Sequence, residues 1–220
     1  MKIKYLILDF GKVLAAPTTG HWFITPKFIE LIDMNEVSVD KFNESSKKYS
    51  HILNRQALTE VDEYKLFYDF YDSILKDINY SKYDKSIVEA LAFNMTYEST
   101  KYTKYDNVND ELEKLSKEYT LIMLTDNWPC VNRILNEYDI TKYFDRVYIS
   151  SVYNCQKSDK VFFDYVINDY DIKEGEAIFI DDNELLLDIA REKDLDTRLM
   201  VRIRDDVKSK HKVIHNLYSI

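Results

Sequence analysis

Short apolar runs that end in polar clusters recur along this chain, and they constrain its fold more than any other feature. The run Lys2–Asp9 (KIKYLILD) is almost continuously apolar, as expected of a parallel strand covered on both faces. Similar runs lead into Thr125-Asp126, Ser150-Ser151 and Asp181-Asp182, and helical patterns separate them. This alternation predicts an α/β fold built around a parallel sheet.

Between about residues 25 and 95 the pattern is purely helical. Thr25 before Pro26 is a candidate N-cap, and Thr59 with Asp62 resembles a capping box that opens a long helix. That helix is predicted to bury one stripe, which consists of Val61, Tyr64, Phe67, Tyr71, Ile74 and Ile78. The chain is therefore predicted to be a core domain of residues 1–15 and 98–220, with a helical insert at residues 16–97.

After the insert, the alternation of helices and strands resumes. Strands are predicted at 120–126, 146–151, 176–182 and 197–203. Helices are predicted at 84–93 within the insert, at 109–119, 129–138, 159–170 and 183–194, and in the C-terminal tail.

Composition excludes several classes of function. Among 220 residues the formal net charge is −9, which argues against nucleic acid as a partner because its phosphates need a basic face. No run approaches the ~18 apolar residues of a membrane helix, and the N-terminal run lacks the features of a signal peptide, so no membrane partner is expected. The two cysteines, Cys130 and Cys155, lack metal-ligand spacing and indicate reduced thiols in the cytoplasm.

The polar clusters at the strand ends predict a site. In an open α/β sheet, ligands bind at the carboxyl ends of the strands, so side chains that follow different strands converge there. Each residue has an ordinary explanation, because Asp9 could be a turn residue, Thr125 a helix cap and Lys157 a solvated loop charge. Their order along the chain, with Asp181 and Asp182 closing the series, favours one shared site.

Four motifs identify the chain as a member of the haloacid dehalogenase (HAD) superfamily by resemblance. LILDFGKVL resembles the first motif, an apolar strand with D-x-D-G-[TV], and LIMLTDN resembles the second, a strand ending in Ser or Thr. NCQKSDKVFFDYV resembles the third, G-x-x-K-P-D, with Asn154 in place of glycine and Ser158 in place of proline. AIFIDDNELLLDIAREKDL resembles the fourth, a strand ending in paired acids. The resemblance implies a Rossmann-like three-layer core with the helical insert as a C1-type cap domain.

The resemblance also implies an activity. It is that of a Mg²⁺-dependent phosphatase, which hydrolyses a small phosphorylated metabolite, such as a sugar phosphate, through an aspartyl-phosphate on Asp9. The implied metal ligands are the carboxylates of Asp9 and Asp182 and the backbone carbonyl of Gly11, with Asp181 as a secondary ligand.

The same resemblance implies the groups that bind the phosphoryl oxygens. Thr125 would donate its hydroxyl, and the segment Asp126–Asn127 would donate amides near a helix N-terminus. Lys157 would neutralise both the nucleophile and the transferred group. Asp9, Thr125 and Lys157 are therefore the expected catalytic residues.

Gly11 departs from the usual motif, in which this position is an aspartate that protonates the leaving oxygen. Glycine keeps the carbonyl but supplies no proton, as in family members that resemble α-glucose-1-phosphatase and carry D-x-G. His21 is a candidate substitute because imidazole titrates near neutral pH, and an exposed histidine without a role is the alternative. Lys12 is either electrostatic support for an anionic ligand or a surface lysine.

Two other functions remain open at this point. A phospho-ligand-binding or regulatory module would keep the pocket and lose turnover through Gly11. A 2-haloacid dehalogenase would use Asp9 and Lys157 without a metal, although the pair Asp181-Asp182 suits a metal site better. Substrate identity, the contacts made by the cap, and the choice between monomer and homodimer stay open.

Overall fold

A computed structural model describes residues 2–203 and 206–220 and divides the chain into two compact units. The first, called here the sheet unit, comprises Met1–Ala16, Lys104–Asn127 and Val131–Ile220. The second, the helical unit, comprises Pro17–Thr103 and Trp128–Cys130. Met1, Arg204 and Asp205 lie outside the described residues, and the last two belong to the C-terminal tail that the sequence predicts to be helical. The assignment of core and cap domains from the sequence stays a prediction.

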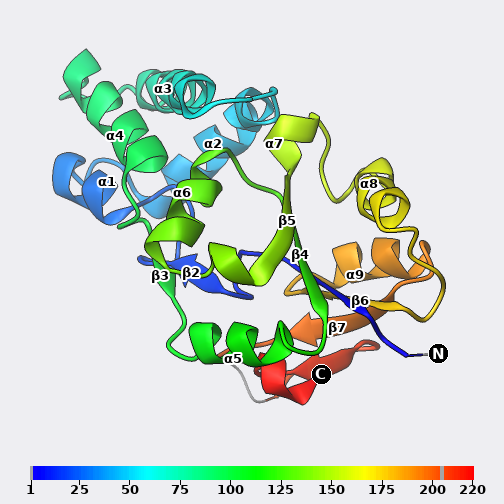
Figure 1. Cartoon of the computed structure of the whole chain (residues 1–220). Helices are drawn as coiled ribbons and strands as arrows, with labels where there is room; N and C mark the ends of the chain where they lie inside the picture. The colour runs from blue at the N-terminus through cyan, green and yellow to red at the C-terminus, as the bar shows by residue number, and fades with distance from the viewer. Residues whose placement is uncertain (1, 204–205) are drawn as a thin grey trace. The chain divides into compact units, whose positions relative to one another are not determined.

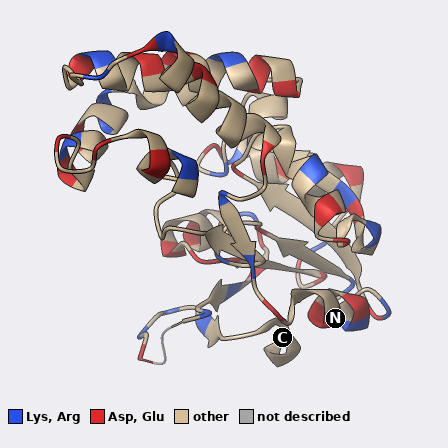
Figure 2. Cartoon of the chain, turned by 90° about the vertical axis from the view of Figure 1, so that its left-hand side faces the viewer, with Lys and Arg blue, Asp and Glu red and all other residues tan. Residues whose placement is uncertain are grey.

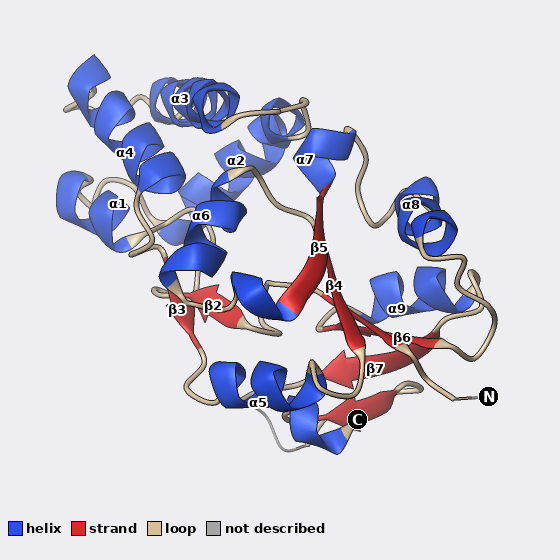
Figure 3. Cartoon of the chain, in the orientation of Figure 1, coloured by secondary structure: helices blue, strands red, loops and turns tan. Residues whose placement is uncertain are grey.

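The sheet unit is built on a parallel sheet. In the described part of the chain this sheet has six strands in the order β5-β4-β1-β6-β7-β8, and each neighbouring pair is parallel (Figure 3). The strands are β1 (Tyr5–Leu8), β4 (Thr120–Thr125), β5 (Phe144–Ile149), β6 (Ala177–Asp181), β7 (Asp196–Met200) and β8 (Lys212–Ile214). The α/β fold with a parallel sheet, predicted from the apolar runs, is confirmed. β1 is buried on both faces, which explains why its sequence is a continuous apolar run.

Helices cover both faces of this sheet and make the three-layer arrangement. The helices between and after the strands are α5 (Val108–Leu115), α6 (Cys130–Glu137), α7 (Ser150–Tyr153), α8 (Val161–Asp169) and α9 (Glu184–Arg191), with 3₁₀ turns η1 (Thr141–Tyr143) and η2 (Leu217–Ser219). Figure 1 shows α8 and α9 on one side of the sheet and α5 on the other. On the α8–α9 side, Phe163 and Leu187 pack in one cluster with Phe179 of β6, and the two phenylalanine rings meet edge to face at 5.1 Å.

The helical unit contains α1 (Pro26–Leu31), α2 (Val39–Leu53), α3 (Glu60–Asp77) and α4 (Lys85–Tyr97) around a core rich in aromatic side chains. Both predicted N-caps are confirmed. The Thr25 hydroxyl accepts the backbone N–H of Phe28, and Thr59 and Asp62 form a reciprocal capping box.

Two short strands that the sequence did not predict, β2 (Ala15–Pro17) and β3 (Tyr102–Lys104), form a separate two-stranded sheet.

Several local predictions are wrong. The predicted stripe of α3 included Val61, which is 56% exposed, because Glu63 takes the inward position in that turn. The C-terminal tail was expected to be helical, but Lys212–Ile214 is strand β8, since β7 offers it an open edge for backbone hydrogen bonds. Ser150-Ser151 begins α7 rather than ending a strand, and the last predicted strand ends at Met200.

The surface carries both signs of charge. Figure 2 shows basic and acidic residues interspersed along the helices. Among the described residues, no helix combines the length and the apolar character needed to cross a bilayer.

Candidate functional site

The ends of three adjacent strands place the first site residues. β1 lies between β4 and β6, and Leu8 is in register with Met123 of β4 and Ile180 of β6. Asp9 therefore follows β1 and lies beside Asp181, the last residue of β6. The backbone N–H of Asp9 donates to the Ile180 carbonyl at 3.0 Å. Thr125 ends β4 and is buried at the same edge of the sheet.

Lys157 joins two of these carboxylates. Its Nζ lies 3.0 Å from Asp9 Oδ1 and donates to Asp181 Oδ2 at 2.6 Å. The three residues are 2%, 7% and 1% exposed, so the interaction takes place away from bulk water. Burial opposes the charged ammonium, but the carboxylates of Asp181, Asp9 and Asp126 outweigh it and raise the pKa of Lys157. Lys157 is therefore a permanent cation against Asp9.

Asp181 is held in place through both carboxylate oxygens. Oδ2 accepts from Lys157, and Oδ1 accepts the backbone N–H of Asn183 at 2.8 Å. Burial raises the pKa of the Asp181 carboxyl, and Lys157 opposes this effect. The Asn183 side chain also accepts from the N–H of Leu185 and so caps α9. The sequence offers a signal for Asn183, because asparagine directly before a helical pattern is a preferred N-cap.

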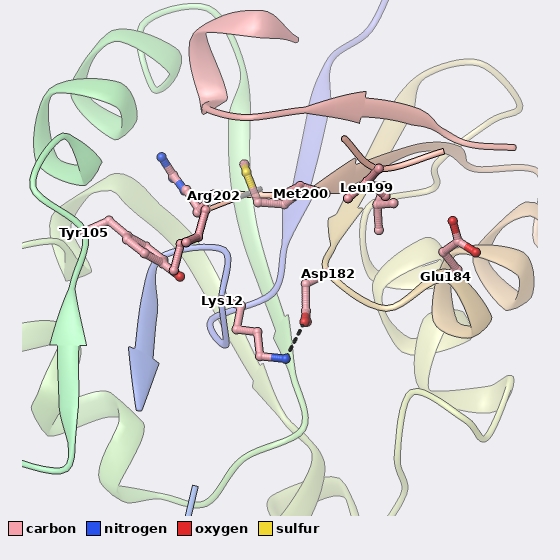
Figure 4. Close-up of a pocket in the computed structure, with 10 residues that line it drawn as sticks. Lys12, Tyr105, Asp182, Glu184, Leu199, Met200 and Arg202 are labelled. Atoms are coloured by element: carbon pink, nitrogen blue, oxygen red, sulfur yellow. Dashed lines mark ion pairs between the residues drawn. The ribbon is translucent and has the colours of Figure 1, made fainter. Parts of the chain in front are cut away.

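Asp182 points to a different cation. Its Oδ2 lies 3.0 Å from Lys12 Nζ (Figure 4), and both side chains are partly exposed. The two residues line a surface pocket of about 550 Å³ together with Tyr105, Glu184 and Arg202, all within the sheet unit. The pocket therefore opens beside the acidic end of β6.

The loop after β4 is tied to the segment that carries Lys157. Asp126 Oδ1 accepts the backbone N–H of Lys157 at 2.9 Å, and the backbone N–H of Asn127 donates to Ser150 Oγ at 3.0 Å. Asn154, which stands where the family pattern has glycine, adopts the left-handed conformation at φ +53°, as its residue type allows. These bonds fix Thr125, Asp126 and Asn127 relative to Lys157.

The acidic residues fit a hard divalent cation. Asp9, Asp181 and Asp182 each place a carboxylate oxygen within 4.8 Å of the others. Among the described residues, Asp9 Oδ1 accepts no hydrogen bond although it is buried, and the Lys157 ammonium is its ionic partner. Carboxylate oxygens are the ligands that Mg²⁺ prefers, so the donor set and the unbonded oxygen both suit that ion.

Gly11 and His21 are the two positions that bear on the missing proton donor. Gly11 bridges to Ala15 in the loop after β1 and offers only backbone groups. His21 lies in the helical unit, where its Nδ1 accepts the N–H groups of Phe23 and Ile24 and its Nε2 contacts Asn43 Oδ1 at 2.7 Å. Both ring nitrogens of His21 thus have local structural bonds, and its role as a proton donor stays a prediction.

One buried ion pair near the site has no sequence signal. The Arg202 guanidinium donates to both carboxylate oxygens of Glu111, at 3.0 and 2.7 Å, and twice to the Val13 carbonyl, at 3.0 and 2.8 Å. Val13 belongs to the loop that follows Asp9, so these hydrogen bonds from Arg202 hold that loop in place. Residues this far apart in sequence carry no pattern that would pair them.

Comparison with known proteins defines the family. The sequence pattern of the haloacid dehalogenase-like hydrolases matches residues 30–199, well over half of the chain. A search of the curated proteins found no match.

Solved structures share the fold. The Bacillus subtilis protein YfnB, bound to magnesium, has a TM-score of 0.69 at 15% identity, covering 100% of this chain and 97% of that one. The L-2-haloacid dehalogenase from Xanthobacter autotrophicus has a TM-score of 0.66 at 13% identity, covering 98% and 95%. A HAD phosphatase from Thermococcus onnurineus has a TM-score of 0.59 at 19% identity, covering 99% and 95%. These likenesses extend over the whole fold, and the family match shows that the chain belongs to the haloacid dehalogenase-like hydrolases.

Proposed function

We propose that this hydrolase is a Mg²⁺-dependent phosphatase that acts on a small phosphorylated metabolite, with Asp9 as its nucleophile. The observation that carries the proposal is the buried Asp9 carboxylate, paired with Lys157 at 3.0 Å and grouped with two further carboxylates within 4.8 Å. A nucleophilic carboxylate beside a fixed cation and an acidic metal-binding group is the arrangement that phosphoryl transfer needs.

In the first step the Asp9 carboxylate attacks phosphorus. A bond forms between the carboxylate oxygen and phosphorus, and the phosphorus–oxygen bond to the alcohol breaks. The alcohol oxygen takes its proton from water, because Gly11 has no side chain to donate one. In the second step water attacks phosphorus, the bond to Asp9 breaks, and inorganic phosphate leaves with the carboxylate regenerated.

Electrostatics decide whether the first step can occur. A phosphate monoester dianion approaching Asp9 meets like-charge repulsion, and the site has to cancel it. Lys157 provides one positive charge, which its carboxylate partners stabilise against the cost of burial. In this proposal the hydroxyl of Thr125 and the amides of the Asp126–Asn127 loop bind the phosphoryl oxygens.

A bound Mg²⁺ would further reduce the repulsion between Asp9 and the phosphate dianion. Asp9 and Asp182, with the Gly11 carbonyl and with Asp181 as a secondary ligand, are the groups proposed to hold Mg²⁺. When bound, the ion supplies positive charge next to the transferred phosphoryl group. Asp181 contributes mainly by orienting Lys157, since both of its oxygens already accept hydrogen bonds.

The test is hydrolysis of p-nitrophenyl phosphate and of a panel of phosphorylated metabolites with Mg²⁺. We expect turnover that is abolished by EDTA and by Asp9→Asn, and retained in the matched control Asp139→Asn, whose side chain is 75% exposed and paired with Lys142. Absence of turnover across the panel, with phosphate ligands still binding by calorimetry, would instead support a binding or regulatory module.

Gly11 replaces the acid that usually protonates the leaving group, and this predicts a preference among phosphate esters. General acid–base catalysis contributes roughly 10²–10⁴ in rate, so the wild type should hydrolyse aryl esters, whose leaving groups need no proton, better than alkyl esters. Gly11→Asp should raise the rate with alkyl esters more than with p-nitrophenyl phosphate.

A 2-haloacid dehalogenase is the second candidate. Its supporting observation is that Lys157 and Lys12 already place two cations against the three carboxylates, so Asp9 could attack carbon and displace halide without a metal. Halide release from 2-haloacids in the presence of EDTA, lost in Asp9→Asn, would favour this activity over the phosphatase.

A further inference from the structure

Lys12 adopts a backbone conformation that presents its side chain to the site. Its φ is +53°, in the left-handed region that residues other than glycine rarely occupy. The loop around it is closed by backbone bonds from Lys12 N–H to the Ala15 carbonyl and from the N–H groups of Leu14 and Ala15 to the Phe10 carbonyl. Because Arg202 also holds the Val13 carbonyl, hydrogen bonds fix the backbone around Lys12, whereas among the described residues its half-exposed side chain is held only by the ion pair with Asp182 drawn in Figure 4.

The two lysines of the site differ in their freedom. Lys157 is buried between Asp9 and Asp181 and cannot leave them without stranding two buried charges. The Lys12 side chain is 52% exposed, and its contact with Asp182 at 3.0 Å is a surface ion pair of the kind that contributes little to stability. Figure 4 shows this pair at the edge of the pocket. Lys12 is therefore the one of these two cations that can be displaced.

The charges of the site show how Lys12 would affect the binding of a divalent cation. With Asp126, whose carboxylate also interacts with Lys157, four carboxylates and two ammonium groups leave a net charge of about −2, and Asp182 has Lys12 as its ionic partner. A divalent cation that binds Asp9 and Asp182 has to compete with the Lys12 ammonium for the Asp182 carboxylate. An ammonium that remains nearby then repels the bound ion.

From these observations, and on the basis of the proposed function, we propose that Lys12 is a tethered counter-cation of Asp182 that lowers the affinity of this carboxylate for Mg²⁺. Metal binding requires the Lys12 side chain to swing away from Asp182 into the adjoining pocket. The site would then respond to the free Mg²⁺ concentration, because its own lysine competes for the ligand.

The expected change in Mg²⁺ affinity follows from Coulomb's law. A single charge about 5 Å from a divalent ion, in surroundings close to the dielectric constant of water, weakens binding on the order of tenfold. Removing the charge should therefore tighten Mg²⁺ binding by about that factor, and added salt should reduce the difference.

The experiment measures metal affinity rather than activity. Mg²⁺ binding is titrated by calorimetry, and Mn²⁺ binding by electron paramagnetic resonance, in the wild type, Lys12→Met, Lys12→Arg and the control Lys210→Met. Lys210 pairs with Asp188 in the same unit at comparable exposure, 60% and 33%, and Asp188 is not one of the three grouped carboxylates. Methionine and arginine carry a Cβ as lysine does, so neither substitution relieves the backbone strain at φ +53° as glycine would.

We expect Lys12→Met to bind Mg²⁺ on the order of tenfold more tightly, and Lys12→Arg and Lys210→Met to bind like the wild type. Equal or weaker binding by Lys12→Met, in a protein where Asp182→Asn abolishes binding, would refute the role of Lys12 and leave the proposed function intact. Absence of binding in both the wild type and Lys12→Met would refute the metal site itself, and with it both proposals.

Discussion

Glu63 provides the most quantitative test of the structure, because an acid is buried in the helical unit without full compensation. Its side chain is fully buried in α3, Oε2 accepts the backbone N–H of Cys130 at 2.8 Å, and among the described residues Oε1 accepts no hydrogen bond. The buried Lys101 ammonium lies nearby and donates to Cys130 Sγ at 3.2 Å. Burial outweighs this cation and raises the pKa of Glu63 from 4.5 to about 7.

The sign of the effect on stability follows from proton linkage. The folded state binds the proton of Glu63 more tightly than the unfolded state, so the contribution of Glu63 is most favourable below about pH 4.5. It is lost as the pH rises toward 7, and the gap between the two pKa values corresponds to about 3 kcal/mol. Well above pH 7 both states are ionised, and the contribution becomes constant.

The perturbation is Glu63→Gln, which keeps the shape and the acceptor for Cys130 N–H and removes the titration. Both tryptophans, Trp22 and Trp128, belong to the helical unit, so fluorescence in a urea titration reports the unfolding of this unit. Titrations from pH 5.5 to 8.5 stay above the isoelectric point near 5.0. Over this range about 2 kcal/mol of the linkage remains to be lost.

We expect the free energy of unfolding of the wild type to fall by about 2 kcal/mol relative to Glu63→Gln between pH 5.5 and 7.5, and then to level off. A constant offset is also expected, because Lys101 loses its acidic neighbour in the variant. Glu89→Gln, at an exposed position of α4, should show no pH-dependent difference. A flat difference for Glu63→Gln, or one that grows in favour of the wild type with pH, would contradict the reasoning.

Two further variants test the buried ion pairs of the sheet unit. Lys157→Met should lower the free energy of unfolding by about 3–5 kcal/mol at neutral pH, because Asp9 and Asp181 are left as buried charges without a cation; circular dichroism in a denaturant titration measures this, and a loss below 1 kcal/mol would count against the bridge. Arg202→Met should destabilise by a similar ~3–5 kcal/mol by stranding Glu111. Adding Glu111→Gln should restore part of that loss in a double-mutant cycle, whereas simple additivity would argue against the pair.

Local chemistry made some elements predictable from sequence and left others out of reach. The caps at Thr25 and Thr59 involve residues three positions apart, so their hydrogen bonds can be read from the chain directly. Strands such as Thr120–Thr125 were predictable because burial on both faces demands a continuous apolar run. Lys212–Ile214 was not predictable, because a three-residue strand exists only through the partner edge of β7.

The α3 stripe shows the same limit in a helix. Periodicity assigned Val61 to the core, but the neighbours of the first turn decide which side of it is covered. Glu63 is the buried residue there, because its carboxylate accepts the free N–H of Cys130, a residue distant in sequence. A hydrophobic pattern cannot anticipate a buried acid that caps another segment.

At the candidate site, the sequence by itself determined the residue types and their positions at the strand ends, because β-strands that are buried must end where polar side chains begin. It also determined that Gly11 brings no side chain to the reaction. Only the tertiary structure decided which cation meets which carboxylate: Lys157 lies between Asp9 and Asp181, and Lys12 lies against Asp182. The parallel register of β1 and β6 and the loop after β1 set these distances, and a charge interacts with its neighbours in space, whatever their separation along the chain.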